Sequence, residues 1–331
     1  MNNLRTGIIG FGFSGRVFQA PFIDAVEGFE LTKISTANPD SIKLIENRYP
    51  DTIIVPRAED IINDTSLDLV IVTSPNIFHY QWTKEALLAG KHVVVEKPFT
   101  NTAAEADELI ELSKQTGKTL TVYHNRRFVS DIKTARKLLF SGLLGDVVDY
   151  EAHFDRFRPE AQPAGYWRED PLPGSGILYD LGSHLIDQAL YLFGLPLAVT
   201  ANICRQRPWA KADDCFDVML HYPTYTATLK SSMLAKIPGP TIQIHGTKGT
   251  FVKYGLDVQE DNINKGLIPN TPDWGKEPEM GWGKLVTEFN GVKLKALVES
   301  ENGDYREFFI NLRDAIMGKT ELAVKPEEAR T

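Results

Sequence analysis

The stretch that decides the fold is Gly10-Phe11-Gly12-Phe13-Ser14-Gly15, which directly follows the apolar run Gly7-Ile8-Ile9. The run predicts a buried strand over 7–10, and residues 14–26 after it have the character of a helix. Between a strand and a helix, G-x-G-x-x-G is typical of a turn that holds a pyrophosphate. Gly10 permits the tight turn, Gly12 lets the backbone approach phosphates, and Gly15 lets the helix pack closely on the strand. The sequence therefore predicts a dinucleotide-binding turn; the alternative is a glycine turn without a ligand.

Short apolar runs continue to alternate with helix-like segments as far as residue 124. The predicted strands are 31–35, 69–73, 92–96 and 120–123, and the predicted helices are 40–49, 77–89 and 102–116. Pro21 is expected to kink the helix over 14–26, because proline cannot continue the helical hydrogen bonds. Continuous apolar strands separated by helices predict a parallel sheet covered on both faces, that is, a Rossmann dinucleotide-binding domain over 1–124.

After residue 145 the predicted strands lengthen and begin to alternate in hydrophobicity. They cover 147–157, 226–233 and 250–254, and residues 262–282, rich in Pro, Gly, Asn and Trp, predict an ordered loop. Alternation suits a sheet with one wet face. The expected fold is therefore α/β, with a second, α+β domain over 125–331 built on one large, mostly antiparallel open sheet.

Composition excludes several functional classes. The 331 residues are 42% hydrophobic and 24% charged, with a formal net charge of −8. An acidic chain without a basic block is a poor candidate for nucleic-acid binding. No apolar run has the length of a membrane span, and the first strand follows too soon for a signal peptide. We therefore expect a cytoplasmic protein that binds neither nucleic acid nor membrane.

The two cysteines, Cys204 and Cys215, are too few for a disulfide framework and do not form a C-x-x-C pair. We interpret both as buried small apolar residues. The sequence therefore predicts neither a zinc site nor any other metal site.

The end of the second strand bears on which dinucleotide binds. A carboxylate about 20 residues past the glycine turn grips the ribose diol of NAD, but here the position falls at Ser35 or Thr36. A hydroxyl accepts a 2′-phosphate without repelling it, and Lys33 or Lys43 is a candidate to pair with that phosphate. NADP(H) is therefore favoured, with NAD(H) as the alternative.

Two further polar stretches end predicted strands, where ligands bind in open α/β sheets. They are Thr73-Ser74-Pro75-Asn76 and Glu96-Lys97-Pro98. Lys97 offers a positive charge and three donors near a reacting oxygen; the alternative is a solvated charge at a strand end. The Lys97–Pro98 bond is a candidate cis peptide.

A third signal is Gly174-Ser175-Gly176-Ile177-Leu178-Tyr179-Asp180-Leu181-Gly182-Ser183-His184. If residues 179–193 are helical, Asp180, His184, Asp187 and Tyr191 share one face. A carboxylate and an imidazole one turn apart suit general acid–base work on a small ligand. The alternative is a packed or solvated histidine, and the helix offers no third ligand for a metal.

Together, the glycine turn, Glu96-Lys97-Pro98 and Asp180-Leu181-Gly182-Ser183-His184 resemble the Gfo/Idh/MocA oxidoreductases over nearly the whole chain. The stretches 124–128 and 153–159 are similar to the branch that contains NADP-dependent scyllo-inositol dehydrogenases. The resemblance implies that Lys97 touches the substrate hydroxyl and the nicotinamide ribose, that His184 is the general base, and that Asp180 holds the substrate or orients His184. The cofactor contacts expected from the motifs and the resemblance are Gly10, Gly12, Phe13, Ser14, Gly15, Ser35, Thr36, Thr73, Ser74, Pro75, Asn76, His79, Glu96, Lys97, Asn125, Trp167 and Arg168.

The implied reaction is reversible hydride transfer between a nicotinamide cofactor and a secondary alcohol of a cyclic polyol or sugar, inositol-like. Arg156 and Arg158 leave an acidic sugar open; the alternative is a solvated or dimer-facing strand. Two other functions stay open: a dinucleotide- and sugar-binding regulator, and a redox glycosidase or a reductase of a non-sugar substrate.

Assembly and the chain end complete the expectations. The wet sheet face with apolar positions such as Phe216, Val218 and Leu220 predicts a sheet-to-sheet homodimer or a homotetramer. Members of the family usually end in a long helix that follows a segment like 324–329. We expect that helix to be missing or cut short here.

Overall fold

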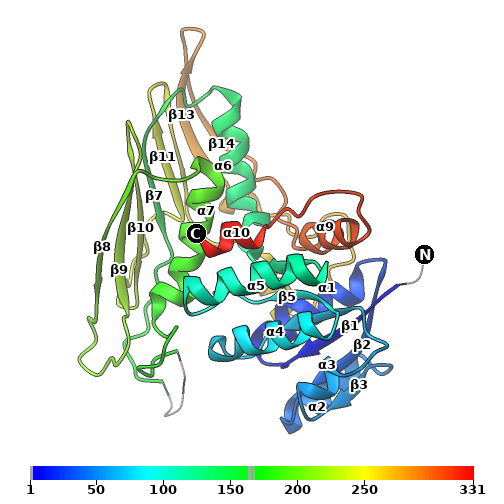
Figure 1. Ribbon diagram of the computed structural model, residues 1–331. Coiled ribbons are helices and arrows are strands. Elements are labelled where there is room, and N and C mark those ends of the chain that lie inside the picture. The colour runs from blue at the N-terminus through cyan, green and yellow to red at the C-terminus, as the bar shows by residue number, and fades with distance from the viewer. Residues whose placement is uncertain (1–2, 163–165, 167) are drawn as a thin grey trace. The chain divides into compact units, whose positions relative to one another are not determined.

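Six parallel strands build the first sheet of the computed structural model, which describes residues 3–162, 166 and 168–331. The strands are β1 Leu4–Ile9, β2 Phe29–Ser35, β3 Ile53–Val55, β4 Leu69–Val72, β5 His92–Val95 and β6 Leu120–Val122. Their order is β3-β2-β1-β4-β5-β6 (Figure 1). This order, which reverses at β1, confirms the predicted Rossmann domain. The edge strand β3 was not predicted from the sequence, because it has only three residues.

Helices follow the strands of this sheet as expected. They are η1 Gly15–Gln19, α1 Ala20–Ala25, α2 Pro39–Arg48, α3 Glu59–Ile62, η2 Asn76–Phe78, α4 His79–Leu88 and α5 Ala103–Thr116. The helix predicted over 14–26 is divided before Pro21, because residues Gly15–Gln19 are π-helical and the α-helix begins only at Ala20. Helices α4 and α5 pack over β4, β5 and β6 through a core that includes Val70, Val93 and Leu109.

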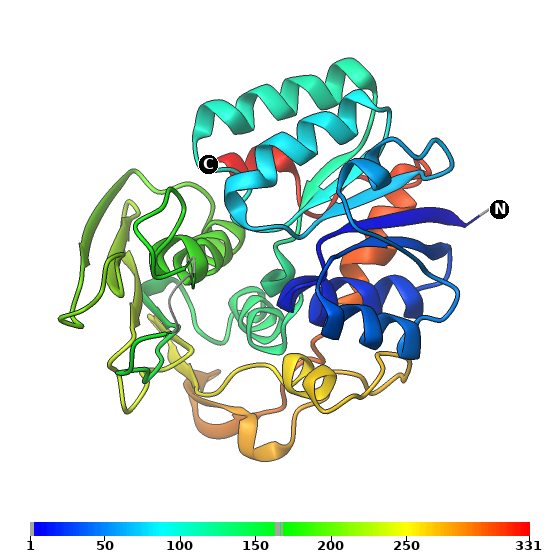
Figure 2. The same ribbon diagram turned by 90° about the horizontal axis from the view of Figure 1, so that it is seen from below.

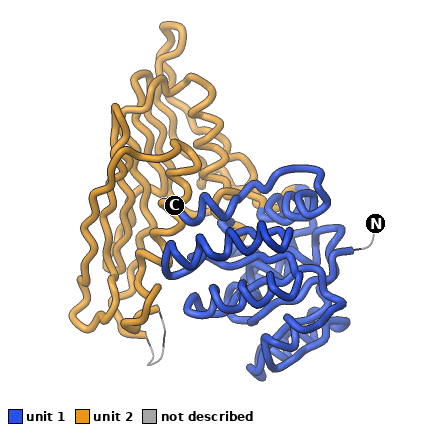
Figure 3. Tube along the Cα trace, viewed as in Figure 1, with its two compact units in different colours: residues 1–125, 260–272, 305–331 blue, residues 126–259, 273–304 orange. Residues whose placement is uncertain are grey.

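Two late segments return to this sheet, so a single boundary at 124/125 does not describe the two units. Figure 3 assigns residues 260–272 and 305–331 to the first unit with 1–125. In helix α9 (Arg306–Ile316), Phe309 stacks on Phe22 with ring centroids 6.0 Å apart. Helix α10 (Pro326–Arg330) has five residues and lies along α5, where Arg330 pairs with Asp107 at 2.7 Å. Helix α10 is thus anchored to α5 within the first unit.

The second unit, residues 126–259 and 273–304, is built on an eight-stranded sheet. Its strands are β7 Val147–His153, β8 Ala198–Cys204, β9 Cys215–His221, β10 Thr226–Ser232, β11 Ile242–Gly246, β12 Gly249–Lys253, β13 Gly283–Phe289 and β14 Val292–Val298. The order is β14-β13-β12-β11-β7-β10-β9-β8, with β7 and β10 parallel and every other neighbouring pair antiparallel. The predicted mostly antiparallel open sheet is thus confirmed.

Helices cover one face of this second sheet, as Figures 1 and 2 show. The covering elements are η3 Asn125–Phe128, α6 Ser130–Ser141, η4 Leu178–Gly182 and α7 Ser183–Phe193. The predicted loop region contains η5 Glu279–Gly281 and the second half of α8 Gln259–Asn264, a helix that belongs almost entirely to the first unit. Among the described residues, no helix combines the length and the apolar character needed to cross a membrane.

The apolar side chains of β9 do not lie on the exposed face of the sheet, where the sequence predicted them. Phe216, Val218 and Leu220 are buried on the helix-covered face, so they are not the uncovered patch that predicted a dimer. The expectation for the cysteines is also wrong: Cys204 and Cys215 are half-exposed and lie opposite each other on β8 and β9. Alternation shows that a strand has two unlike faces, but not which face a distant helix covers.

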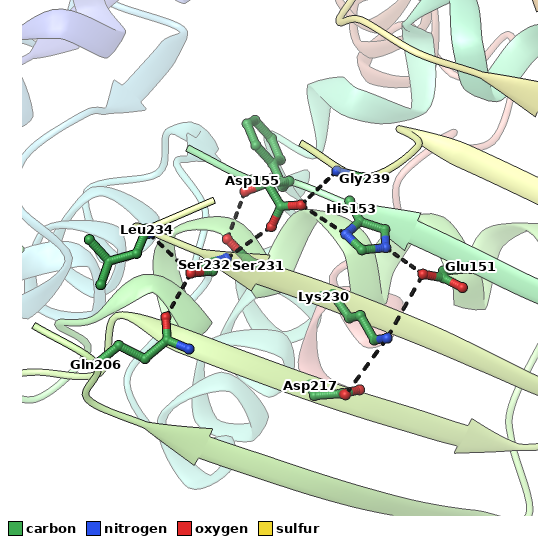
Figure 4. A network of polar contacts seen from close by, with 11 residues as sticks. Glu151, His153, Asp155, Gln206, Asp217, Lys230, Ser231, Ser232, Leu234 and Gly239 are labelled. Atoms are coloured by element: carbon green, nitrogen blue, oxygen red, sulfur yellow. Dashed lines mark hydrogen bonds and ion pairs between the residues drawn. The ribbon is translucent and has the colours of Figure 1, made fainter. Parts of the chain in front are cut away.

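The face of this sheet opposite the helices carries a charged network instead (Figure 4). His153 lies between two carboxylates, with Nε2 2.5 Å from Glu151 Oε1 and Nδ1 2.9 Å from Asp155 Oδ2. Burial lowers the pKa of His153, but the hydrogen bonds and charges of Asp155 and Glu151 outweigh burial, and the net shift is upward. Lys230 lies 3.8 Å from Glu151 and 4.0 Å from Asp217.

Candidate functional site

The glycine turn has the open cradle that its sequence predicts. Gly10 has a φ of +90° and donates its N–H to Ser35 O at 3.1 Å. A Cβ on Gly15 would lie 2.8 Å from Gly10 O, whereas a Cβ on Gly12 would meet no atom within 4 Å. Gly10 and Gly15 thus serve the turn itself, and Gly12 leaves space above the backbone amides.

Two hydroxyl side chains near the turn differ in their hydrogen bonding: that of Thr73 bonds to the turn, and that of Ser74 has no hydrogen-bond partner among the described residues. Thr73 donates its N–H to Ile9 O and its hydroxyl to Gly10 O, both at 2.9 Å, and these bonds hold the glycine turn in place. The hydroxyl of Ser74 is buried and has no hydrogen-bond partner among the described residues. Open amides beside an unsatisfied buried hydroxyl fit the phosphate and ribose groups of a dinucleotide.

A buried carboxylate joins the turn to the end of β5. Glu96 accepts hydrogen bonds from the Ser14 hydroxyl and, at 2.7 Å, from Gln19 Nε2. Burial raises the pKa of Glu96, against the lowering effect of those bonds and of Lys97. Gln19 was not predicted as a site residue, because no local motif marks this fully buried side chain in the π-helical turn η1.

Lys97 follows Glu96 directly, and the expected cis peptide to Pro98 is present. Its ammonium is half-buried and near enough to lower the pKa of both Glu96 and His79. His79 is buried with Nδ1 2.8 Å from Pro98 O and Nε2 3.0 Å from Ser74 O. His79 therefore connects the loop after β4 to the loop after β5. Burial lowers the pKa of His79 to about 4.

The remaining predicted nicotinamide-end residues also lie at strand ends of the first unit. Asn76 opens η2 after β4 and Asn125 follows β6, and both side chains are buried. Pro75 and Phe13 are exposed beside these loops. The residues of the first unit that were predicted to lie near the nicotinamide thus all follow the carboxyl ends of β1, β4, β5 and β6.

The end of β2 carries hydroxyls, as expected, but only one of its two candidate lysines is available. Ser35 is buried, and half-exposed Thr36 donates its N–H to Val55 O at 2.9 Å. Lys33 is paired with Asp64, which corrects its proposed role at a 2′-phosphate. Lys43 is exposed on α2.

The second unit places Asp180 in the π-helical turn η4. Gly176 has a φ of +88°, and a Cβ there would lie 1.9 Å from Asp213 Oδ1, whose carboxylate accepts the N–H of Leu178 through Oδ2 at 2.8 Å. This tight start aims Asp180 at Arg168, with Oδ1 3.5 Å from Nε. Trp167, expected beside Arg168, lies outside the described residues.

His184 is buried at the start of α7 and stacks on Phe154, which the sequence analysis missed as a site residue. The expected common face of Asp180, His184, Asp187 and Tyr191 is interrupted, because a π-helical turn holds more residues than an α-helical one. Asp187 instead pairs with Arg127 at 2.6 Å, and Tyr191 lies 5.1 Å from the Arg127 guanidinium carbon. Strand alternation could have placed Phe154 on the helix-covered face, but not against His184.

Both parts of the chain match one family. Residues 4–124 match "Oxidoreductase family, NAD-binding Rossmann fold", and residues 136–331 match "Oxidoreductase family, C-terminal alpha/beta domain". The first unit is therefore a nicotinamide-dinucleotide-binding domain.

Named relatives and solved structures agree. The chain is 40% identical to scyllo-inositol 2-dehydrogenase (NADP(+)) IolW of Bacillus subtilis over 99% of this chain and 90% of that protein. It is also 40% identical to the uncharacterized oxidoreductase YdgJ of Escherichia coli over 99% and 93%. The structure of the putative oxidoreductase yvaA from Bacillus subtilis superposes with a TM-score of 0.94 at 39% identity, covering 99% of this chain and 93% of that one. The chain belongs to the Gfo/Idh/MocA oxidoreductase family.

Proposed function

We propose that the protein is an NADP(H)-preferring dehydrogenase that interconverts a secondary alcohol and a ketone on a cyclic polyol or sugar. The observation that carries this proposal is the buried imidazole of His184, held against Phe154 in the same unit as Asp180, whose side chain is mostly buried. An imidazole titrates near neutrality and suits proton transfer with a hydroxyl. The name of the B. subtilis relative supports an inositol-like substrate.

Three residues of this chain have defined roles in the proposed reaction: His184, Lys97 and Asp180. His184 takes the hydroxyl proton, Lys97 stabilises the developing alkoxide by its charge, and Asp180 holds a neighbouring hydroxyl or orients His184. A bound nicotinamide supplies or accepts the hydride. The residues expected to hold it are those of the glycine turn, Ser74, Asn76, Glu96 and Asn125.

The cofactor preference rests on the end of β2. Ser35 and Thr36 offer hydroxyls where a carboxylate would repel a 2′-phosphate, and the exposed Lys43 is available as a counter-charge. The relative named for NADP(+) supports the same preference.

The test is steady-state turnover on a panel of inositols, hexoses, glycosides and keto-sugars with NADP(H) and NAD(H). Cofactor-dependent oxidation of at least one ring polyol or sugar is expected. Tight cofactor binding without turnover of any panel member would favour a regulator, and product lacking a net redox change would favour a redox glycosidase.

We also propose that the protein forms a homodimer or homotetramer. The buried positions of β9 no longer support this proposal, but apolar side chains on the edge strands do. Val199 and Ile203 on β8 and Val292, Leu294 and Leu297 on β14 are exposed. Light scattering at micromolar concentration tests it, and a monomer would contradict it.

A further inference from the structure

The two cysteines, which the proposed reaction does not use, lie opposite each other at one edge of the second sheet. Cys204 is the last residue of the edge strand β8, Cys215 is the first residue of β9, and the antiparallel register pairs them directly. Directly opposed residues of an antiparallel pair have Cα atoms about 4.5–5.5 Å apart, and disulfides span about 4.4–6.8 Å. The fold thus already holds the two cysteines at a separation that a disulfide can bridge.

The two thiols contact each other and are open to solvent. Both side chains are partly exposed, so a small molecule in solution can reach them. Burial, a hydrogen bond with Cys204 and nearby negative charge raise the pKa of Cys215 to about 12. Because the thiolate is the attacking species and Cys215 keeps its proton, Cys204 is the thiol that attacks an external disulfide first.

The cysteines close the base of the loop 205–214, which connects β8 to β9. Hydrogen bonds already hold this base, because the Asp214 N–H donates to Cys204 O at 3.1 Å and the Asp214 carboxylate accepts the N–H of Gln206 at 2.6 Å. The side-chain oxygen of Gln206 also accepts the hydroxyl of Ser232 on β10 at 2.7 Å (Figure 4). The entropy of closing the loop is thus already lost on folding, and this favours an internal disulfide over a lasting bond to an external thiol.

The same loop supports the turn that carries Asp180. Asp213 O accepts the N–H of Ile177 at 3.0 Å, and the Asp213 carboxylate accepts the N–H of Leu178 at the start of η4. Residues of the loop also line the same hollow as Asp180, namely Arg207, Ala210, Lys211, Ala212 and Asp213. A covalent bond at the base of the loop would therefore restrict the support of a residue of the proposed substrate site.

We propose that Cys204 and Cys215 are a modification site, at which a low-molecular-weight disulfide such as oxidised glutathione converts the two thiols into an internal disulfide that fixes the loop 205–214. The Cys204 thiolate attacks one sulfur of the oxidant and releases one thiol, which leaves a mixed disulfide on Cys204. Cys215 then gives its proton to solvent and attacks the Cys204 sulfur, which releases the second thiol. Two protein thiols are oxidised and one external disulfide is reduced to two thiols.

The first experiment is mass spectrometry of the folded protein after incubation with oxidised glutathione. The wild type is expected to lose two hydrogens and to carry no glutathione. Trypsin cleaves after Arg205, Arg207 and Lys211, which places the two cysteines on separate peptides, so a linked pair of peptides identifies the bond. Cys215→Ser is expected to retain one bound glutathione, because the thiol that would release it is absent.

A matched control keeps two thiols on the same strands but moves one of them out of register. In the double variant Cys204→Ser and Asn202→Cys, the new thiol is diagonal to Cys215, because Asn202 pairs with Asp217. Diagonal neighbours lie about 7–8 Å apart, beyond the span of about 6.8 Å that a disulfide reaches. This variant is expected to retain glutathione and to form about tenfold less internal disulfide than the wild type.

Amide hydrogen exchange then measures the effect on the loop. The oxidised wild type is expected to exchange about threefold or more slowly than the reduced protein over 205–214 and at the amides of Ile177 and Leu178, which Asp213 holds. Strand β4 of the first unit is the internal control and is expected to exchange equally in both forms. The variant with serine at both cysteine positions is expected to show no response to the oxidant.

Each outcome decides one part of the proposal. A wild type that stays reduced, or that retains glutathione, would overturn the internal disulfide. As much linked peptide in the out-of-register control as in the wild type would show that the pairing of β8 with β9 does not select the bond. An internal disulfide that leaves exchange over 205–214 unchanged would overturn its effect on the loop. None of these measurements depends on turnover, so they stand or fall independently of the proposed function.

Discussion

The imidazole of His184 stacks on the phenyl ring of Phe154, with ring centroids 6.3 Å apart and planes 29° from parallel. His184 lies in α7 and Phe154 directly follows β7, so the sheet of the second unit orients the proposed base. A ring that is fixed from one side presents its nitrogens in a restricted set of directions. Orientation of a general base is part of its catalytic effect.

We therefore expect Phe154→Leu to lower kcat about tenfold, with a smaller change in KM, because the imidazole loses its stacking surface. The pH dependence of kcat is expected to shift as well, which a purely structural role would not cause. The matched control is Phe251→Leu, the same change at a buried position of β12. Both substitutions are expected to cost about 1–2 kcal/mol of stability, so equal effects on kcat would contradict the positioning role of Phe154.

Removal of the proposed chemical groups is expected to stop turnover without loss of the cofactor. His184→Ala deletes a general base, which typically costs about 10²–10⁴-fold in rate, and Lys97→Ala deletes a half-buried charge and is expected to cost at least as much. Both variants keep the glycine turn and are expected to change NADPH fluorescence as the wild type does. Near wild-type turnover in both would show that the site is assigned wrongly.

The two roles considered for Asp180 can be separated by its kinetics. Asp180→Asn keeps the shape but removes the charge that pairs with Arg168. If Asp180 grips the substrate, KM rises while kcat is nearly kept; if it orients His184, kcat falls. We expect the first result, because the charged partner 3.5 Å from Asp180 is Arg168. A fall in kcat alone would reassign Asp180 to positioning His184.

The cofactor preference depends on a single side chain that can be exchanged cleanly. Thr36→Asp places a carboxylate at the end of β2, where it accepts the ribose diol of NAD and repels a 2′-phosphate. We expect the NADPH-to-NADH ratio of kcat/KM to fall at least tenfold. Thr36→Asn, which is similar in shape but neutral, is the control and should change the ratio far less. A wild type that prefers NAD by tenfold, about 1.4 kcal/mol, would contradict the interpretation of this strand end.

Sequence reasoning predicted what local patterns determine. The glycine turn, the strand ends at Asn76 and Lys97, and both sheet types follow from residue spacing within short windows. The edge strand β3 was missed because three residues carry too little periodicity. The direction of Phe216, Val218 and Leu220 depends on which face of the sheet the helices cover, and no alternating pattern contains that information.

The contacts that local patterns did not predict have the same cause, because their partners are remote in sequence. Gln19 reaches Glu96 across 77 positions, and Thr121 donates to Val324 O across 203 positions, which draws the chain end back to the first sheet. Lys33 was predicted as a candidate partner for a 2′-phosphate, but it is paired with Asp64, 31 positions away in the sequence. Side chains that act through such contacts carry no motif of their own.

The carboxylates around His153 make the stability of the second unit depend on pH. The net pKa of His153 is raised above its ordinary 6.5 in the folded chain, so its contribution is fully present below that pH and is lost as pH rises through the folded pKa. His153→Gln is therefore expected to destabilise the protein more at pH 6 than at pH 9, measured by urea unfolding. The control is His221→Gln on β9, which removes an imidazole that bonds the Thr200 hydroxyl. Equal pH dependence in the two variants would show that Glu151 and Asp155 do not hold the His153 proton in the folded protein.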